Sequence, residues 1–256
     1  MKLEKIVGVK KFPPGAAGAL DVVRAYLEQF GNEDPPATRG NPLDIRDHDL
    51  TTLLGCPTQV YGDFLCSCNN LVNLEHAPAL CNGDFLCSIN KLTSLHGLPR
   101  SINGRLYVNN NNLTNLDGCS DTVHADFFCG NNKLTSLTNC PRTVGGLFHC
   151  VNNELTALEN FHTSVGDDFT CSGNKIKTLH NVHKMFGSIK GMFIANECPI
   201  TSHVLGLILI PDLKRVVLDA EEVADIVNRH LGTGRVGILA CQRELIAAGY
   251  KDFAQI

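Results

Sequence analysis

The sequence predicts a solenoid of stacked units, in which each unit contributes one short strand to a parallel sheet. Three observations lead to this prediction: a constant repeat length, an apolar alternation at the start of each unit, and an asparagine at a fixed place. The units open at Leu43, Phe64, Phe85, Leu106, Phe127, Phe148 and Phe169, each 21 residues after the last. Because one such unit cannot bury its apolar side alone, the units must stack around a shared core.

The strand prediction rests on the first three positions of each unit. Positions one and three are apolar, as expected for a strand whose alternate side chains point into a core. They are Phe64 and Cys66, Phe85 and Cys87, Leu106 and Val108, Phe127 and Cys129, Phe148 and Cys150, and Phe169 and Cys171. Further apolar residues at positions eight, eleven and eighteen complete the predicted core.

Position six holds the asparagine, as Asn69, Asn90, Asn111, Asn132, Asn153 and Asn174. An inward amide at this place can bond the backbone groups that are left open where the chain leaves the strand. Burying those groups unpaired would cost on the order of 1–3 kcal/mol each. A degenerate eighth unit is expected to follow one residue late, with Met192, Phe193 and Asn196 at positions two, three and six.

The outer side of the units carries a recurring proline, as Pro57, Pro78, Pro99 and Pro141, with glycine five residues later. Proline lacks an N–H donor and fixes its own φ angle, so it disfavours a helix there. The sequence therefore predicts an extended, polyproline-like outer side.

Units two and three read FLCSCNNLVNLEHAPALCNGD and FLCSINKLTSLHGLPRSINGR. They resemble the leucine-rich-repeat core, L-x-L-x-x-N-x-L-x-x-L, and this resemblance covers about residues 43–201. The short repeat with its proline is similar to the leucine-rich repeats of secreted bacterial effectors and of bacteriophage proteins. The resemblance implies an α/β solenoid, a horseshoe with the parallel sheet on its concave face. It also implies a viral gene product that acts in the reducing cytosol of a bacterial host or in a virion.

Both ends of the solenoid are expected to carry helical caps. The first cap, residues 1–42, contains an amphipathic segment at 16–31. The second cap, residues 202–256, contains two helical segments, DAEEVADIVNRHL and GRVGILACQRELIAAG. This tail is similar to the one that follows the repeats of many phage leucine-rich-repeat proteins.

The composition argues against nucleic-acid and membrane partners. The formal net charge is −4, and no basic stripe is present in the sequence. No apolar run reaches the roughly 18 residues that span a bilayer.

Twelve cysteines raise the alternatives of a disulfide or metal framework and of buried thiols in a reducing compartment. Most of them share columns of the repeat, which favours packing as small apolar residues. The pair His180 and His183 lacks a nearby thiol or carboxylate cluster, and GTGRVG at 232–237 lacks the lysine of a phosphate-binding loop. We therefore expect no catalytic residue, no metal and no cofactor.

The candidate binding residues lie on the concave face, where position two points out of the core. This column holds Leu65, Leu86, Tyr107, Phe128 and His149, with Asp44 before it and Thr170 after it. The consecutive apolar and aromatic members form a stripe roughly 15 Å long at the usual strand spacing. Polar neighbours at positions four and five complete the candidate set: Asn109, Asn110, Asn131 and Asn152. An apolar patch with a polar rim is typical of an interaction site.

Three functions remain open at this point. The chain is expected to bind a protein partner, host or viral, as an adaptor or inhibitor. Alternatively, it is a structural subunit of a virion or of a homo-oligomer, or an enzyme with a cysteine or metal site. The stripe is also open to being covered by the chain's own terminal segments.

Overall fold

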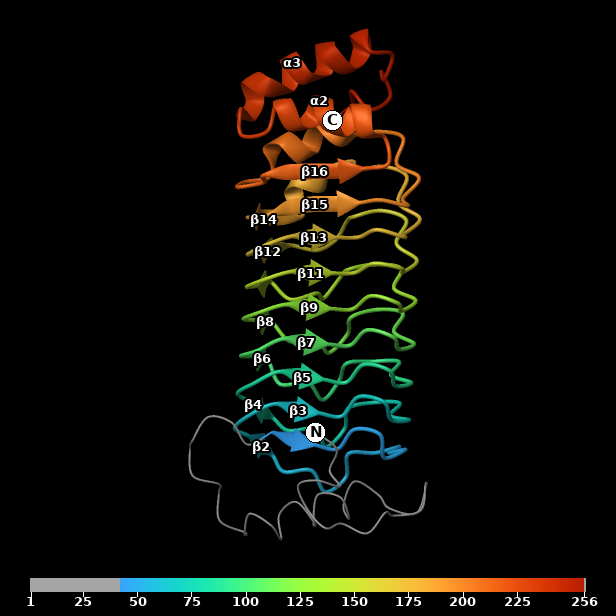
Figure 1. Ribbon diagram of the computed structural model, residues 1–256, viewed down its shortest axis with the longest axis vertical. Coiled ribbons are helices and arrows are strands. Elements are labelled where there is room, and N and C mark those ends of the chain that lie inside the picture. Colours follow the sequence, from blue (N-terminus) through green and yellow to red (C-terminus); the bar gives the residue numbers. More distant parts are fainter. Residues whose placement is uncertain (1–41, 256) are drawn as a thin grey trace.

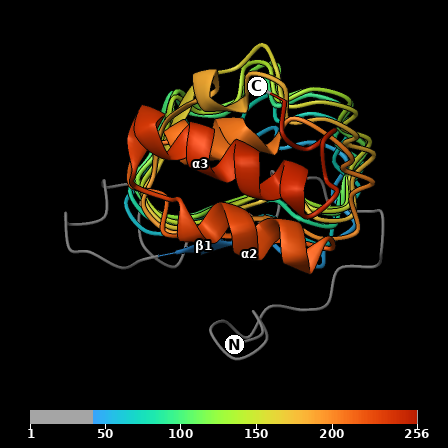
Figure 2. The ribbon, with the colours of Figure 1, turned by 90° about the horizontal axis from the view of Figure 1, so that it is seen from above.

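The computed structural model describes residues 42–255 of the chain. The predicted N-terminal helical cap, residues 1–42, lies outside the described residues except for Pro42. Within the described range the units stack along one long axis, and helices lie at the C-terminal end (Figures 1 and 2). The predicted solenoid with a parallel sheet is confirmed.

One sheet of nine parallel strands runs the length of the solenoid, in the order β1-β3-β5-β7-β9-β11-β13-β15-β16. The strands are β1 (Leu43–Asp44), β3 (Phe64–Leu65), β5 (Phe85–Leu86), β7 (Leu106–Tyr107), β9 (Phe127–Phe128), β11 (Phe148–His149), β13 (Phe169–Thr170), β15 (Met192–Ala195) and β16 (Arg215–Leu218). Position one of each of the first six units pairs with position one of the next. We call the outward side of this sheet the sheet face; it is the side predicted to be concave.

The outer side of each unit is extended, as predicted. It forms further short strands: β2 (Gln59–Val60), β4 (Leu80–Cys81), β6 (Ser101–Ile102), β8 (Thr122–Val123), β10 (Thr143–Val144), β12 (Thr163–Val165) and β14 (Phe186–Ile189). The sequence did not predict that these segments pair with one another. They form a five-stranded parallel sheet, β14-β12-β10-β8-β6, and a two-stranded one, β2-β4.

The core lies between these two sides and is built from the predicted columns. Positions one, three, eight and eleven of units two to seven are buried. Phenylalanine rings at position one contact the next ring along the stack, for example Phe64 and Phe85 with centroids 5.0 Å apart. Burying each such side chain stabilises the fold by about 1.5–3 kcal/mol relative to leaving it exposed.

The asparagines at position six join adjacent units. The Asn132 amide nitrogen donates to the carbonyl oxygens of Val108 at 3.0 Å and of Cys129 at 3.1 Å. Its oxygen accepts the Leu113 N–H at 3.0 Å. One side chain therefore satisfies backbone groups of its own unit and of the preceding one, and the five other predicted asparagines repeat this pattern.

The predicted alignment of the eighth unit is wrong. Phe169 pairs with Phe193, which places Phe193 at position one rather than three. A 3-10 helix in unit seven, η2 (Val182–Lys184), lengthens that unit, and the pattern therefore resumes late. Cys198, not Asn196, takes the position-six place, and its thiol donates to the Cys171 carbonyl oxygen at 3.3 Å.

The C-terminal segment closes the solenoid with η3 (Val204–Leu209), α2 (Glu221–Arg229) and α3 (Gly234–Ala247). The two predicted C-terminal helices are thus confirmed, and β16 extends the sheet beyond residue 201, where the repeat was expected to end. Asn228 of α2 protects this last strand, because its amide accepts the Val216 N–H at 2.7 Å and donates to the Val216 carbonyl at 2.9 Å. Among residues 42–255, no helix is long and apolar enough to cross a membrane.

Replacing a ladder asparagine is expected to destabilise the stack. Asn132→Ala leaves the Leu113 N–H buried without its partner, at a cost of roughly 1–3 kcal/mol, whereas the Val108 and Cys129 carbonyls keep the amides of Asn111 and Asn153 as donors. Urea denaturation measures the difference. Asn103→Ala is the control, because Asn103 is exposed and its amide bonds only the Asn82 side chain. Equal, small losses in the two variants would mean that the ladder does not join the units.

Candidate functional site

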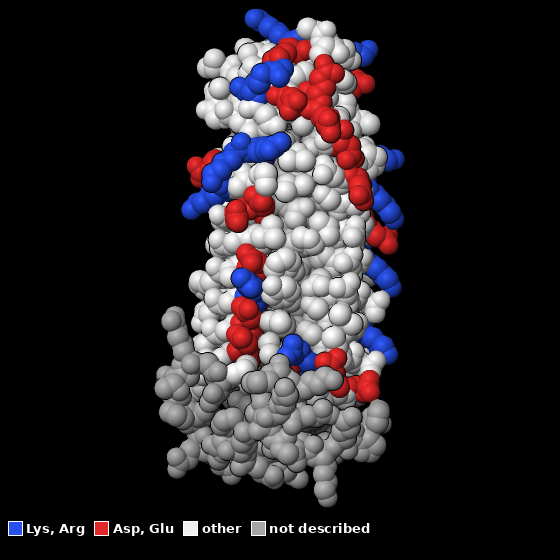
Figure 3. Space-filling model, in the orientation of Figure 1, with Lys and Arg blue, Asp and Glu red and all other residues white. Residues whose placement is uncertain are grey.

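The position-two side chains are held on the sheet face by strand alternation. Phe64, Phe85 and their equivalents are buried, whereas the next residue of each strand is only half-buried. The structure thus brings five predicted residues into one row across β3, β5, β7, β9 and β11: Leu65, Leu86, Tyr107, Phe128 and His149. We call this row the stripe. Figure 3 shows a broad uncharged band running along the sheet face.

Ring stacking orders the aromatic half of the stripe. The Tyr107 and Phe128 rings are stacked, with centroids 4.5 Å apart and an interplanar angle of 13°. Phe128 and His149 are 5.5 Å apart and tilted by 44°. Aromatic contacts of this kind contribute about 0.5–1.5 kcal/mol beyond area burial. They also hold three rings as one preformed surface.

His149 is a partly buried member of the stripe. Its Nδ1 is buried and has no hydrogen-bond partner among residues 42–255. The neighbouring Gly130 leaves room for the ring, since a Cβ at that glycine would lie 3.0 Å from Nδ1. Desolvation by burial lowers the pKa of His149 below its ordinary 6.5. The ring is therefore neutral at pH 7 and extends the uncharged surface.

The predicted asparagines at positions four and five have structural tasks that the sequence did not reveal. The Asn109 amide oxygen accepts the Ser88 hydroxyl at 2.6 Å. Asn110, Asn131 and Asn152 have φ angles of 56°, 53° and 52°, in the left-handed region that asparagine tolerates. The Asn152 amide also donates to the Asn131 amide oxygen at 2.9 Å. Their residue type is therefore explained by the turn after each strand, whether or not a partner touches them.

The same turn holds Ile89, which the repeat places at position five but which was not among the candidate binding residues. Ile89 occupies position five with a φ of 54°, and its side chain is 55% exposed beside the stripe. A β-branched residue in the left-handed region is strained, and strain of this kind clusters at functional sites. The signal in the sequence was an isoleucine at position five, where units four to six carry asparagine; Cys68 of unit two holds the same position with a φ of 58°.

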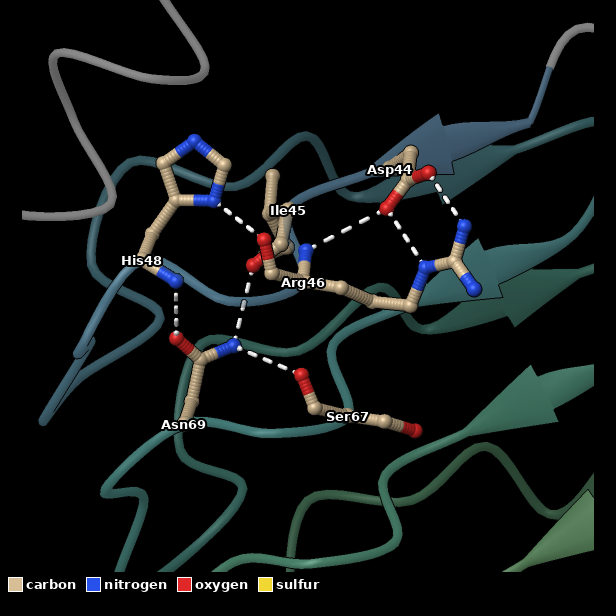
Figure 4. A network of polar contacts seen from close by, with 6 residues as sticks. All are labelled: Asp44, Ile45, Arg46, His48, Ser67 and Asn69. Atoms are coloured by element: carbon tan, nitrogen blue, oxygen red, sulfur yellow. Dashed lines mark hydrogen bonds and ion pairs between the residues drawn. The ribbon is translucent and has the colours of Figure 1, made fainter. Parts of the chain in front are cut away.

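Charged side chains end the stripe at the first unit. Asp44 and Arg46 form a two-point ion pair, Nε to Oδ1 at 2.9 Å and Nη2 to Oδ2 at 2.7 Å (Figure 4). Asn69 lies close by, where its oxygen accepts the His48 N–H at 3.1 Å and its nitrogen donates to Ile45. The apolar row therefore begins only at Leu65.

Charges also line both margins of the stripe, which the sequence analysis overlooked. The residue before each strand forms one margin in units two to five, as Asp63, Asp84, Arg105 and Asp126. Position seven forms the other margin in the same units, as Asn70, Lys91, Asn112 and Lys133. Figure 3 shows these two lines of charge on either side of the uncharged band. The 21-residue spacing could have revealed both margins in the sequence, because the residue before each strand and the residue at position seven recur with that spacing.

The cysteines do not form a reactive site on this face. All twelve are free, and those at position three are buried. Desolvation holds the pKa of the Cys129, Cys150 and Cys171 thiols well above the ordinary value of 9.0. The exception is Cys198, where a hydrogen bond with Cys171 lowers the pKa. Within residues 42–255, no group of three histidines, cysteines or carboxylates has the geometry to hold a metal ion.

A similar fold of stacked units also occurs in a known protein structure. The structure of a Shigella effector LRR domain matches with a TM-score of 0.50 and 21% sequence identity, over 70% of this chain and 80% of that one. The fold is that of a leucine-rich-repeat solenoid. No protein-family model and no curated protein sequence matches the chain. The fold predicted from the sequence resemblance is thus confirmed.

Removing the strain at Ile89 is expected to stabilise the protein. Ile89→Asn installs the residue type that units four to six use at this φ angle, and a gain of about 1 kcal/mol is expected. Thermal denaturation measures it, with Val72→Asn as the control because Val72 is similarly exposed and has no positive φ. A loss of stability in Ile89→Asn would contradict this reading of the turn.

Acid is expected to weaken the fold partly through His149. Because the pKa is lowered in the folded state, the unfolded chain binds more protons as the pH falls. The stability that neutral His149 provides is therefore full above about pH 6.5 and is lost as the pH falls below that value. His149→Gln is expected to lose less stability than the native protein between about pH 7.5 and about pH 5 in urea titrations. The control is His96→Gln, at an exposed site, which is expected to follow the native protein. If the free energy of unfolding of His149→Gln changes with pH as steeply as that of the native protein, this assignment is wrong.

Proposed function

We propose that this chain is a protein-recognition module that binds a macromolecular partner on its sheet face. The observation that carries the proposal is the uncharged row from Leu65 to Phe128, half-exposed on a rigid sheet. Contiguous apolar surface with a polar rim marks interaction sites, and extended solenoid faces serve as binding surfaces.

The chemistry of the row suits tight binding. Large aromatic side chains near the centre of an interface carry much of the binding energy. Tyr107 and Phe128 are central in the stripe and already stacked, so binding orders few additional rotamers. His149 extends the surface without adding a charge that would need to be desolvated.

The matched Shigella protein is described as an effector. Together with the resemblance of the repeats to phage and effector sequences, this supports a more specific proposal. We infer an adaptor or inhibitor, phage-encoded, that acts on a host protein in a reducing cytosol. Twelve free thiols suit that compartment, because disulfides persist in oxidising ones. The proposal involves no catalytic step, cofactor or nucleic acid.

A structural role in a virion or homo-oligomer is the second candidate, and one observation favours it. Helix α3 exposes three apolar side chains at the end of the solenoid, Val236 at 84%, Leu239 at 60% and Ile246 at 53%. Such a surface suits contact with another copy. Multi-angle light scattering separates the candidates: a mass that rises with concentration and returns to the monomer in Leu239→Glu supports the structural role, whereas a constant monomer counts against it.

Binding through the stripe is tested by two substitutions. Tyr107→Ala removes one stacked ring, and Phe128→Asp places a charge in the middle of the apolar row. Each is expected to weaken binding of a protein partner, isolated from bacterial cells, at least tenfold, because central aromatic truncations cost about 2 kcal/mol or more. Surface plasmon resonance measures the affinity.

The control is Leu80→Asp, which changes an exposed leucine on β4, in the sheet of the outer side. All three variants are expected to keep a melting temperature close to that of the native protein, because the changed side chains are not in the core. Unchanged affinity in both Tyr107→Ala and Phe128→Asp would overturn the proposed function.

A further inference from the structure

The two margins of the stripe carry opposite charge in units two to five. Asp63, Asp84 and Asp126 outnumber the single Arg105 on one margin. The other margin has Lys91 and Lys133 and no acidic residue. The strand register aligns the units, so each margin is a continuous line along the solenoid axis.

The acidic margin is held rigidly by the backbone. Oδ1 of Asp63 accepts the Asp84 N–H at 2.8 Å, and Oδ1 of Asp126 accepts the Leu147 N–H at 2.9 Å. The second oxygen of Asp126 pairs with Arg105 at 3.2 Å. These contacts fix the carboxylates beside the stripe, so a cationic group of a partner meets them with little loss of side-chain freedom.

The basic margin is freer. Lys91 and Lys133 are exposed, and the Lys133 ammonium group donates to the Asn112 side chain at 3.1 Å. A partner that lies on the stripe in units two to five is therefore flanked mainly by anions on one side and by cations on the other.

The distance between successive side chains of the stripe indicates which secondary structure a bound segment has. Successive position-two side chains lie about 4.8 Å apart, the usual distance between paired strands. One turn of an α-helix advances by about 5.4 Å, whereas same-side residues of an extended strand lie roughly 6.6 Å apart. A helix along the solenoid axis thus offers one apolar side chain for each unit, which an extended chain does not.

We propose that the stripe binds an amphipathic α-helix of a partner protein, about three to four turns long, with basic residues on one flank and acidic residues on the other. This inference rests on the proposed function and specifies its partner. The charged pair Asp44 and Arg46 limits the helix at the first unit. The opposed margins fix which way the helix runs, because reversing its direction would place each flank beside a margin of like charge.

Three designed helical peptides of equal length test the proposal. All carry the same leucine and phenylalanine face; one has lysine on one flank and glutamate on the other, one has lysine on both, and one has glutamate on both. Fluorescence anisotropy with the full-length chain at low salt is expected to show the opposed-flank peptide binding most tightly. Phe128→Asp is expected to abolish this binding.

A charge swap provides the decisive comparison. In Lys91→Glu/Lys133→Glu both margins are acidic, so the opposed-flank peptide is expected to bind about tenfold more weakly and the all-lysine peptide about tenfold more tightly. The matched control is Lys177→Glu/Lys184→Glu, which changes the net charge equally but lies outside units two to five and is expected to leave the order of affinities unchanged.

The inference is overturned if none of the peptides binds, if all three bind equally, or if the swap leaves their order unchanged. Its failure is distinguishable from failure of the proposed function. If the peptides fail while Tyr107→Ala and Phe128→Asp still lose the cellular partner, only the helical occupant is wrong. If those variants keep the partner, the binding face itself is wrong.

Discussion

Hydrogen bonds from the position-six asparagines are the interaction on which the rest of this structure depends. Each amide joins its own unit to the preceding one through buried backbone groups, as Asn132 does with Cys129 and Val108. Because these bonds recur in units two to seven, the strands are held in one register, and equal positions form straight columns. The phenylalanine core, the stripe and both charged margins are consequences of that alignment.

Some positions of the repeat stabilise the fold, and others carry the side chains that we assign to recognition. Positions one and three are buried, and cysteine fills position three of most units as a small apolar residue. Burial raises the pKa of the Cys129 and Cys150 thiols, which keeps them protonated. Position two is free of that constraint and carries the aromatic side chains that we assign to binding. Position five adopts a left-handed backbone conformation, which explains its asparagines, and Cys68 and Ile89 adopt the same conformation without being asparagine or glycine.

The sequence was sufficient to predict whatever the repeat length determines: the strands, the core columns, the asparagine ladder and the outward row from Leu65 to His149. It failed where the spacing changes, because the extra turn at Val182–Lys184 shifts Phe193 and gives the ladder place to Cys198. The hydrogen bond between Asn228 of α2 and Val216 of β16 could not be predicted, because this contact lies outside the repeats and has no equivalent in other units. The opposite margins and the unusual residue type at Ile89 were readable in the sequence, whereas the left-handed φ angle of Ile89 came only from the structure.

Site-specific photo-crosslinking tests the central claim most directly, namely that the sheet face is the binding surface. A photoreactive phenylalanine analogue is placed at Phe128 on the sheet face or at Leu80 on the outer side, and the protein is irradiated in bacterial cells. The account predicts a discrete protein adduct from position 128, competed away by unlabelled native chain, and none from position 80. The same adduct from position 80 alone would contradict it.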